Sequence, residues 1–187
     1  MPAISQRGQA VPPSPIRKLV PLAEAAVAQG VKVYFLNIGQ PDLTPPTEFW
    51  DAIHQRQDPM VAYTNSVGNA SLRAKVRAAY GARGIELTDQ ELIVTTAGSE
   101  AILFAMMAAL NPGDEIIVPE PFYANYNGYS AMAGVKVVPI RTVIEHGFQL
   151  PGIEEFASRI TPRTRAIMIC NPNNPTGAVY DRGQLKA

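Results

Sequence analysis

The sequence predicts an α/β fold: a mostly parallel sheet flanked by helices and preceded by an N-terminal arm and a helix. Two observations indicate this class. From about residue 69 onward, apolar strand-like runs alternate regularly with helix-like segments. These runs, such as IIV at 116–118, are continuously apolar instead of alternating, which is typical of strands covered on both faces.

The composition favours a packed core and excludes several classes of partner. Of the 187 residues, 47% are hydrophobic and 17% charged, and 16 Lys and Arg balance 16 Asp and Glu. Zero net charge argues against binding nucleic acid or anionic membranes. One cysteine, Cys170, and two histidines provide neither a disulfide framework nor a zinc site. No run approaches the ~20 apolar residues that span a bilayer, so we expect a cytoplasmic protein.

Residues 1–45 are expected to form an N-terminal arm and a segment of a small domain. Residues 1–14 are polar and carry prolines, which predicts an extended arm ordered only against another surface, such as a second subunit. A helix is predicted over 14–30, where Pro21 should kink or divide it. A short strand is predicted over 31–39.

Residues 46–187 are expected to be the first half of a larger domain. Helices are predicted over 47–56, 69–84, 98–113, 123–134 and 152–160, with another beginning at 181. Strands are predicted over 92–96, 114–120, 135–140 and 164–170. Because ligands of such sheets bind beyond the carboxyl ends of the strands, the segments that follow strands are candidate sites. Three such segments are TTAGSEA at 95–101, PEPFYANY at 119–126 and NPNNPTG at 171–177.

The segment TTAGSEA places a glycine and a serine where a strand meets a helix. The first amides of a helix are unpaired and carry the positive end of its dipole. The amides of Gly98, Ser99 and Glu100, with the Ser99 hydroxyl, are therefore candidates to bind a phosphate. The alternative is an ordinary Gly-Ser cap. The segment is neither a P-loop nor a dinucleotide fingerprint, because the glycine spacing of both is absent.

The segment PEPFYANY places aromatic residues directly after a strand. Phe122 or Tyr123 could present a ring to a planar ligand, although plain packing of these rings is the alternative.

The segment NPNNPTG is the most specific of the three. Its prolines stiffen the backbone and bias the preceding residues toward extended conformations, so the amides of Asn171 and Asn174 should be aimed at one point. We expect Asn174 to contact the ligand and Asn171 to support the turn. The alternative is an ordinary Asn-Pro turn.

In this order and spacing, the three segments, with NIGQPDLTPP at 37–46 and YTNSVGNASLR at 63–73, resemble the class I and II aminotransferases. These are fold-type I enzymes that use pyridoxal 5'-phosphate (PLP). The resemblance covers nearly the whole chain and implies that it is the N-terminal half of the large domain with the segment before it. It also implies cis peptide bonds preceding Pro121 and Pro175.

Within the cofactor site, the resemblance implies that Gly98, Ser99 and Glu100 hold the phosphate of PLP. It implies that Tyr123 stacks on the pyridine ring. Asn174 would bind the phenolic oxygen and so tune the pKa of the cofactor imine.

Two further positions matched by the resemblance lie earlier in the chain. Tyr63 would reach the phosphate bound by the neighbouring subunit of a homodimer, and Gly39 would approach the carboxylate of the substrate. The expected substrates are an amino acid and a 2-keto acid, and no metal is expected.

The chain departs from the family because the Schiff-base lysine in its Ser-x-x-Lys setting is not found. The lysines present are Lys18, Lys32, Lys75, Lys136 and Lys186. Residues 1–187 should therefore not transaminate alone. Three alternatives to an aminotransferase stay open: a C-S lyase or cyclopropane-forming synthase of the same fold, a noncatalytic ligand-sensing domain, and an inactive fragment.

Overall fold

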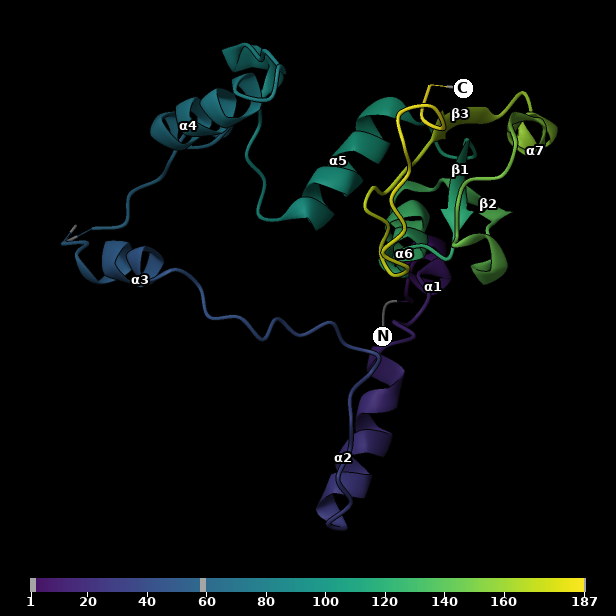
Figure 1. Cartoon of the computed structure of the whole chain (residues 1–187), viewed down its shortest axis with the longest axis horizontal. Helices are drawn as coiled ribbons and strands as arrows, with labels where there is room; N and C mark the ends of the chain where they lie inside the picture. The colour runs from purple at the N-terminus through teal and green to yellow at the C-terminus, as the bar shows by residue number, and fades with distance from the viewer. Residues whose placement is uncertain (1–2, 58–59, 187) are drawn as a thin grey trace. The chain divides into compact units, whose positions relative to one another are not determined.

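The computed structural model describes residues 3–57 and 60–186. The chain divides into two compact units: Met1–Val31 with Gly98–Ala187, here called the sheet unit, and Lys32–Ala97, here called the helical unit. Figure 1 shows the elements of each. The domain division expected at residue 45 stays a prediction.

The sheet unit is built on three parallel strands in the order β2-β1-β3. The strands are β1 (Glu115–Glu120), β2 (Lys136–Arg141) and β3 (Thr164–Ile167). In the central strand, Ile117 is opposite Val138 of β2 and Ile167 of β3. The predicted parallel sheet flanked by helices is therefore confirmed, although β3 ends three residues before the predicted boundary at 170.

Helices cover the sheet on both faces, as the continuous apolar strands predict. The sheet unit contains α1 (Gln6–Ala10), α2 (Val20–Ala28), α5 (Gly98–Ala109), α6 (Asn125–Ala133) and α7 (Ile153–Arg159), with single 3-10 turns at Arg17–Leu19 and Ile144–His146. One core cluster joins Met106 of α5 and Tyr126 of α6 to Ile116 and Val118 of β1. The side chain between them on β1, Ile117, faces the opposite cluster with Phe156 of α7.

The helical unit contains α3 (Thr47–His54), α4 (Ala70–Gly81) and a 3-10 turn at Asp89–Glu91. The predicted Asn69 cap is confirmed, because its side chain accepts a hydrogen bond from the Leu72 amide at 3.2 Å. The predicted strands over 31–39 and 92–96 are wrong, since neither run forms a ladder within the described residues. A strand needs a paired neighbour, and an apolar run alone does not provide one.

Three further predictions for the sheet unit need correction. Residues 6–10 form a short helix that contacts α6 of the same chain, so the N-terminal arm is not simply extended. The α6 helix begins at residue 125 instead of 123. Residues 182–186 form turns instead of the predicted helix, and Asp181 and Gln184 each accept a side-chain bond from the other's backbone amide.

The prediction that Pro21 divides the helix expected over 14–30 is confirmed. The 3-10 turn at Arg17–Leu19 precedes α2, and Pro21 stands in the first turn of α2, where its missing N–H costs little.

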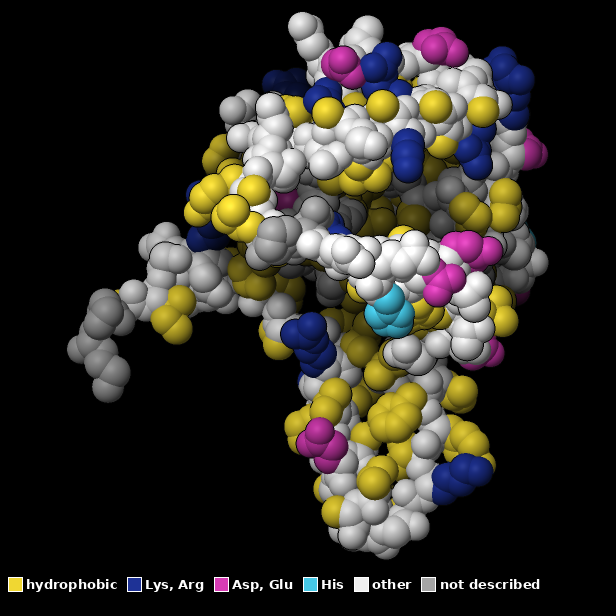
Figure 2. Space-filling view, turned by 90° about the vertical axis from the view of Figure 1, so that its left-hand side faces the viewer, with side chains coloured by type: hydrophobic (Ala, Val, Ile, Leu, Met, Phe, Trp, Pro, Cys, Tyr) yellow, Lys and Arg dark blue, Asp and Glu magenta, His cyan; other side chains and the backbone are white. Residues whose placement is uncertain are grey.

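The α2 helix buries none of its residues within the chain, and Leu22 and Val27 are 69% and 53% exposed. Hydrophobic side chains stand at the surface in the lower part of Figure 2, where α2 lies. Among the described residues, no helix is both long and apolar enough to cross a membrane.

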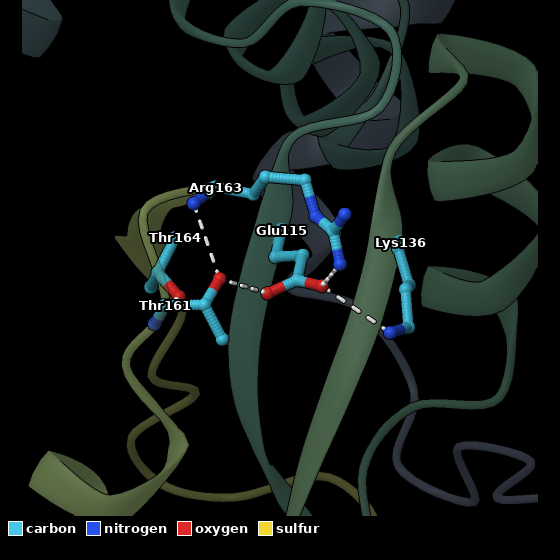
Figure 3. A network of polar contacts seen from close by, with 5 residues as sticks. All are labelled: Glu115, Lys136, Thr161, Arg163 and Thr164. Carbon is cyan, nitrogen blue, oxygen red and sulfur yellow. Dashed lines mark hydrogen bonds and ion pairs between the residues drawn. The ribbon is translucent and has the colours of Figure 1, made fainter.

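A buried carboxylate clamps the amino ends of the three strands. Glu115, at the start of β1, is 1% exposed. Its Oε1 accepts bonds from Lys136 of β2 and Arg163 before β3, both at 3.2 Å, and its Oε2 accepts a bond from the Thr161 hydroxyl at 2.7 Å. Figure 3 shows Lys136 approaching the carboxylate from β2, and Thr161 and Arg163 approaching it from the segment before β3. The Thr161 hydroxyl and the two cations outweigh burial and lower the pKa of Glu115.

This lowered pKa predicts how stability depends on pH. Because the native state holds Glu115 ionised, its contribution is complete above the ordinary glutamate value of about 4.3 and is lost as pH falls through the lowered native pKa. Replacing Glu115 with Gln should therefore flatten the dependence of the unfolding free energy on pH below about 4.3. Urea unfolding at a series of pH values measures this dependence.

Glu155→Gln is the matched control, because Glu155 pairs with Arg159 on the exposed surface of α7. A pH profile changed equally by both substitutions would contradict the role assigned to the Glu115 clamp.

Candidate functional site

The segments that follow β1 and β3 meet at the carboxyl end of the sheet, opposite the Glu115 clamp. The Asn173 amide, in the loop after β3, donates to the Pro121 carbonyl after β1 at 3.0 Å. The Tyr129 hydroxyl of α6 donates to Ser99 Oγ at the start of α5 at 2.6 Å. These contacts gather the predicted candidate segments of the sheet unit into one region.

The first turn of α5 lies beside open space. Gly98 begins the helix, and the first amides of a helix have no acceptor four residues earlier within it. A Cβ built on Gly98 would meet no atom within 4 Å. Gly98 and Ser99 are both exposed. An anion could therefore approach these amides and the Ser99 hydroxyl, which suits the phosphate site that the sequence predicts.

Tyr123 is held by its neighbours on two sides. Its ring packs edge-on against Tyr126 with the ring centroids 5.5 Å apart, and its hydroxyl accepts a bond from the Asn125 amide at 2.6 Å. Burial, with the nearby Tyr129 hydroxyl, raises the pKa of Tyr123, so the phenol stays neutral near pH 7. The half-buried ring has a fixed orientation, which a stacking residue needs.

The three asparagines of NPNNPTG differ in their contacts. Asn171 exchanges two bonds with the Tyr180 backbone, at 3.0 and 3.1 Å, which confirms that it supports the turn. Asn173 is buried and bonds the Pro121 carbonyl and the Thr176 hydroxyl. The side chain of Asn174 is exposed. The Asn171 amide is bound to Tyr180 and the Asn173 amide to Pro121 and Thr176, which leaves Asn174 as the candidate to contact the ligand; the expectation that the Asn171 amide is aimed at the ligand is wrong.

Backbone geometry agrees with the resemblance at both expected prolines. The peptide bonds preceding Pro121 and Pro175 are cis, and so is the Asn171-Pro172 bond, which was not predicted.

Sequence reasoning missed two polar residues, Asn125 and Tyr129. Asn125 donates to the hydroxyl of Tyr123 at 2.6 Å and to that of Tyr129 at 3.5 Å. Their spacing of four residues on a helix gives a signal that they share a face. Nothing local, however, indicates that Tyr129 reaches Ser99, which lies 30 residues earlier in the chain.

A pocket of about 670 Å³ lies beside Tyr123 and Asn125. It is lined by residues 11–17 of the N-terminal segment and by α6 residues that include Asn125 and Met132, together with Tyr123. It does not include Gly98, Ser99 or Asn174, so it is a neighbour of the candidate phosphate site and not that site itself.

Two predicted site residues lie in the helical unit. Tyr63 is fully exposed in this chain. Gly39 is exposed too, and a Cβ built on it would meet no atom within 4 Å. Their roles, and those of the residues in the sheet unit, stay predictions.

The different contacts of Asn173 and Asn174 predict that their substitutions change stability unequally. Asn173→Ala leaves the Pro121 carbonyl without its buried partner and should lower the unfolding free energy by about 1–3 kcal/mol. Asn174→Ala removes an exposed side chain and should change it by less than about 0.5 kcal/mol. Denaturant unfolding of the two variants measures the difference, and equal losses would contradict the assignment.

Comparisons with known proteins agree with the predicted family. Residues 31–187 match the family model for aminotransferase class I and II. The chain is 35% identical over 189 residues to the aspartate/prephenate aminotransferase of Thermus thermophilus, covering 100% of this chain and 49% of that protein. It is 35% identical over 170 residues to the arginine–pyruvate transaminase AruH of Pseudomonas aeruginosa, covering 88% of this chain and 42% of that protein.

Solved structures give the same result. An alanine aminotransferase from Pyrococcus furiosus is 37% identical and matches with a TM-score of 0.87, covering 98% of this chain and 48% of that one. The Thermus thermophilus aspartate aminotransferase double mutant is 35% identical and matches with a TM-score of 0.89, covering 100% of this chain and 49% of that one. The chain thus spans about half the length of these relatives. It belongs to the class I and II aminotransferase family.

Proposed function

We propose that this chain carries the cofactor site of a PLP-dependent aminotransferase, which moves an amino group between an amino acid and a 2-keto acid. The observation that carries the proposal is the meeting, at one end of the sheet, of the α5 amides, the Tyr123 ring and the loop of Asn174. Membership of the family supports it. The relatives' printed names differ in amino acid, so the substrate within this class is not assigned.

The groups present suit PLP chemically. Phosphate is an anion, and the first turn of α5 offers it amides and the Ser99 hydroxyl. A planar pyridine suits the fixed ring of Tyr123. A phenolate oxygen suits the outward amide of Asn174, which can donate without adding charge. When bound, PLP supplies the electron sink that stabilises negative charge at the substrate α-carbon.

The residues of this chain would hold the cofactor and fix its orientation. The helix dipole and the Ser99 hydroxyl would fix one end of the cofactor, Tyr123 would limit the tilt of its ring, and Asn174 would hold the oxygen beside the reacting carbon. Lys136 is occupied by Glu115 at the far end of the sheet. We infer that no lysine among residues 1–187 supplies the covalent link to the cofactor.

Two roles require more than the sheet unit. We propose that Gly39 approaches the substrate carboxylate and that Tyr63 reaches the phosphate bound by a second subunit. The complete exposure of Tyr63 and the partial exposure of Leu22 and Val27 on α2 support a homodimer. Sedimentation equilibrium tests the dimer, and a monomeric mass at micromolar concentration would count against it.

A titration tests the proposed cofactor site. The purified protein should bind pyridoxamine 5'-phosphate, the amino form of PLP, which has no aldehyde and so reports noncovalent contacts alone. Tyr123→Ala should weaken binding by about 1 kcal/mol, or roughly fivefold, because stacking is lost. Tyr123→Phe keeps the ring but loses the hydroxyl that Asn125 holds, so it should weaken binding less, about twofold to threefold. Isothermal titration calorimetry gives the dissociation constants.

Absence of any binding by the unsubstituted protein would overturn the proposed function. Transamination itself is tested by following transfer of ¹⁵N from labelled amino acids to pyruvate or 2-oxoglutarate in the complete protein. Release of free ammonium in place of transfer would favour a lyase.

A further inference from the structure

A chain of hydroxyl groups runs from α6 to the start of α5. Asn125, the first residue of α6, donates to the Tyr123 hydroxyl at 2.6 Å and makes a longer contact of 3.5 Å with the Tyr129 hydroxyl. The Tyr129 hydroxyl donates to Ser99 Oγ at 2.6 Å. Two elements far apart in sequence are thus joined through polar groups at the candidate site.

The direction of donation along this series of hydrogen bonds follows from Asn125, where the series begins. An amide NH₂ can only donate, so both phenol oxygens act as acceptors toward Asn125. Tyr129 can then pass its own hydrogen to Ser99 Oγ. With that oxygen accepting, the hydrogen of Ser99 is free to be donated to a further acceptor. The chain therefore ends in an outward donor.

This outward donor lies where an anion would bind. Ser99 is exposed, whereas Asn125, Tyr123 and Tyr129 are half-buried, so the chain has a sheltered origin and an open end. Ser99 is the second residue of α5, so this end lies in the first turn of that helix, where the helix dipole is positive. Helix packing alone does not require a hydroxyl on Tyr129, since its ring would contact the core equally well without one.

We propose that Tyr129 and Asn125 are positioning residues of the cofactor site: Tyr129 turns the Ser99 hydroxyl toward the phosphate, and Asn125 fixes Tyr123. The inference rests on the proposed function, because it takes the phosphate of PLP as the acceptor. Neither residue touches the cofactor. Tyr129 acts through Ser99, and Asn125 acts through the two phenols.

Tyr129→Phe tests the first part with two ligands that differ only in the phosphate. Its dissociation constant for pyridoxamine 5'-phosphate should rise about tenfold, the effect of weakening one hydrogen bond to a charged group. Its dissociation constant for pyridoxamine should stay within about twofold, because no phosphate is present. A purely structural role would weaken both ligands equally, and that result, or no change for either, would overturn the inference.

Two further variants make the test specific. Tyr126→Phe removes a phenol hydroxyl from the same helix but keeps the ring that packs against Tyr123; because that hydroxyl bonds Cys170 and not Ser99, any change should be equal for the two ligands. Ser99→Ala should reproduce the phosphate-specific loss, and adding Tyr129→Phe to it should cost little more. Additive losses would show that Tyr129 does not act through Ser99. Because Ser99 is exposed, its substitution is informative even if Tyr129→Phe misfolds.

Asn125→Ala tests the second part. Without Asn125 the Tyr123 hydroxyl loses its donor, as it does in Tyr123→Phe, so both pyridoxamine and its phosphate should bind about twofold to threefold more weakly, in contrast to Tyr129→Phe. Unchanged affinity for pyridoxamine would overturn this part.

Different results would contradict the proposed cofactor site and the positioning role of Tyr129. If the unsubstituted protein binds neither pyridoxamine 5'-phosphate nor inorganic phosphate, both the proposed function and this inference are wrong. If it binds the phosphate ester, and Ser99→Ala weakens binding while Tyr129→Phe does not, the cofactor site stands and the positioning role of Tyr129 is wrong.

Discussion

The central strand β1 is buried on both faces, and the rest of the sheet unit depends on that burial. Ile116 and Val118 pack under α5 and α6, while Ile117 packs under α7. Burying such side chains contributes about 1.5–3 kcal/mol each. Because α5 and α6 share one cluster with β1, the first turn of α5 and the first residues of α6 are fixed relative to the strand end. The hydroxyl chain between them depends on this shared packing.

The two ends of the sheet have different chemistry. At the amino ends, a buried carboxylate gathers two cations and a hydroxyl that arrive from the neighbouring strand and loop. At the carboxyl ends, the hydrogen bonds of the candidate site join neutral amides, phenols and a hydroxyl, and Gly98 faces open space. Charge is thus satisfied internally at one end, while donors remain for a ligand at the other.

Local signals in the sequence predicted most of the sheet unit and one helix of the helical unit. The Gly98 start and the continuous apolar run at 116–118 gave a correct helix and central strand, and the Asn69 cap gave a correct α4. The runs at 31–39 and 92–96 were assigned wrongly, because strand formation depends on a partner that an apolar run does not identify. Asn125 and Tyr129 were missed for a similar reason, since Ser99 is distant in sequence. Likewise, Glu115 is 48 residues from Arg163, and no local pattern reveals the pair.

The loop after β3 keeps its own shape with side chains that do not face the ligand. Asn171 closes it onto Tyr180, and Asn173 ties it to the segment after β1. Its conformation is therefore set before any small molecule arrives, so binding need not order it. Shape and recognition are carried by different residues of one seven-residue motif. In such a loop, the recognising position can change during evolution while the frame that presents it stays the same.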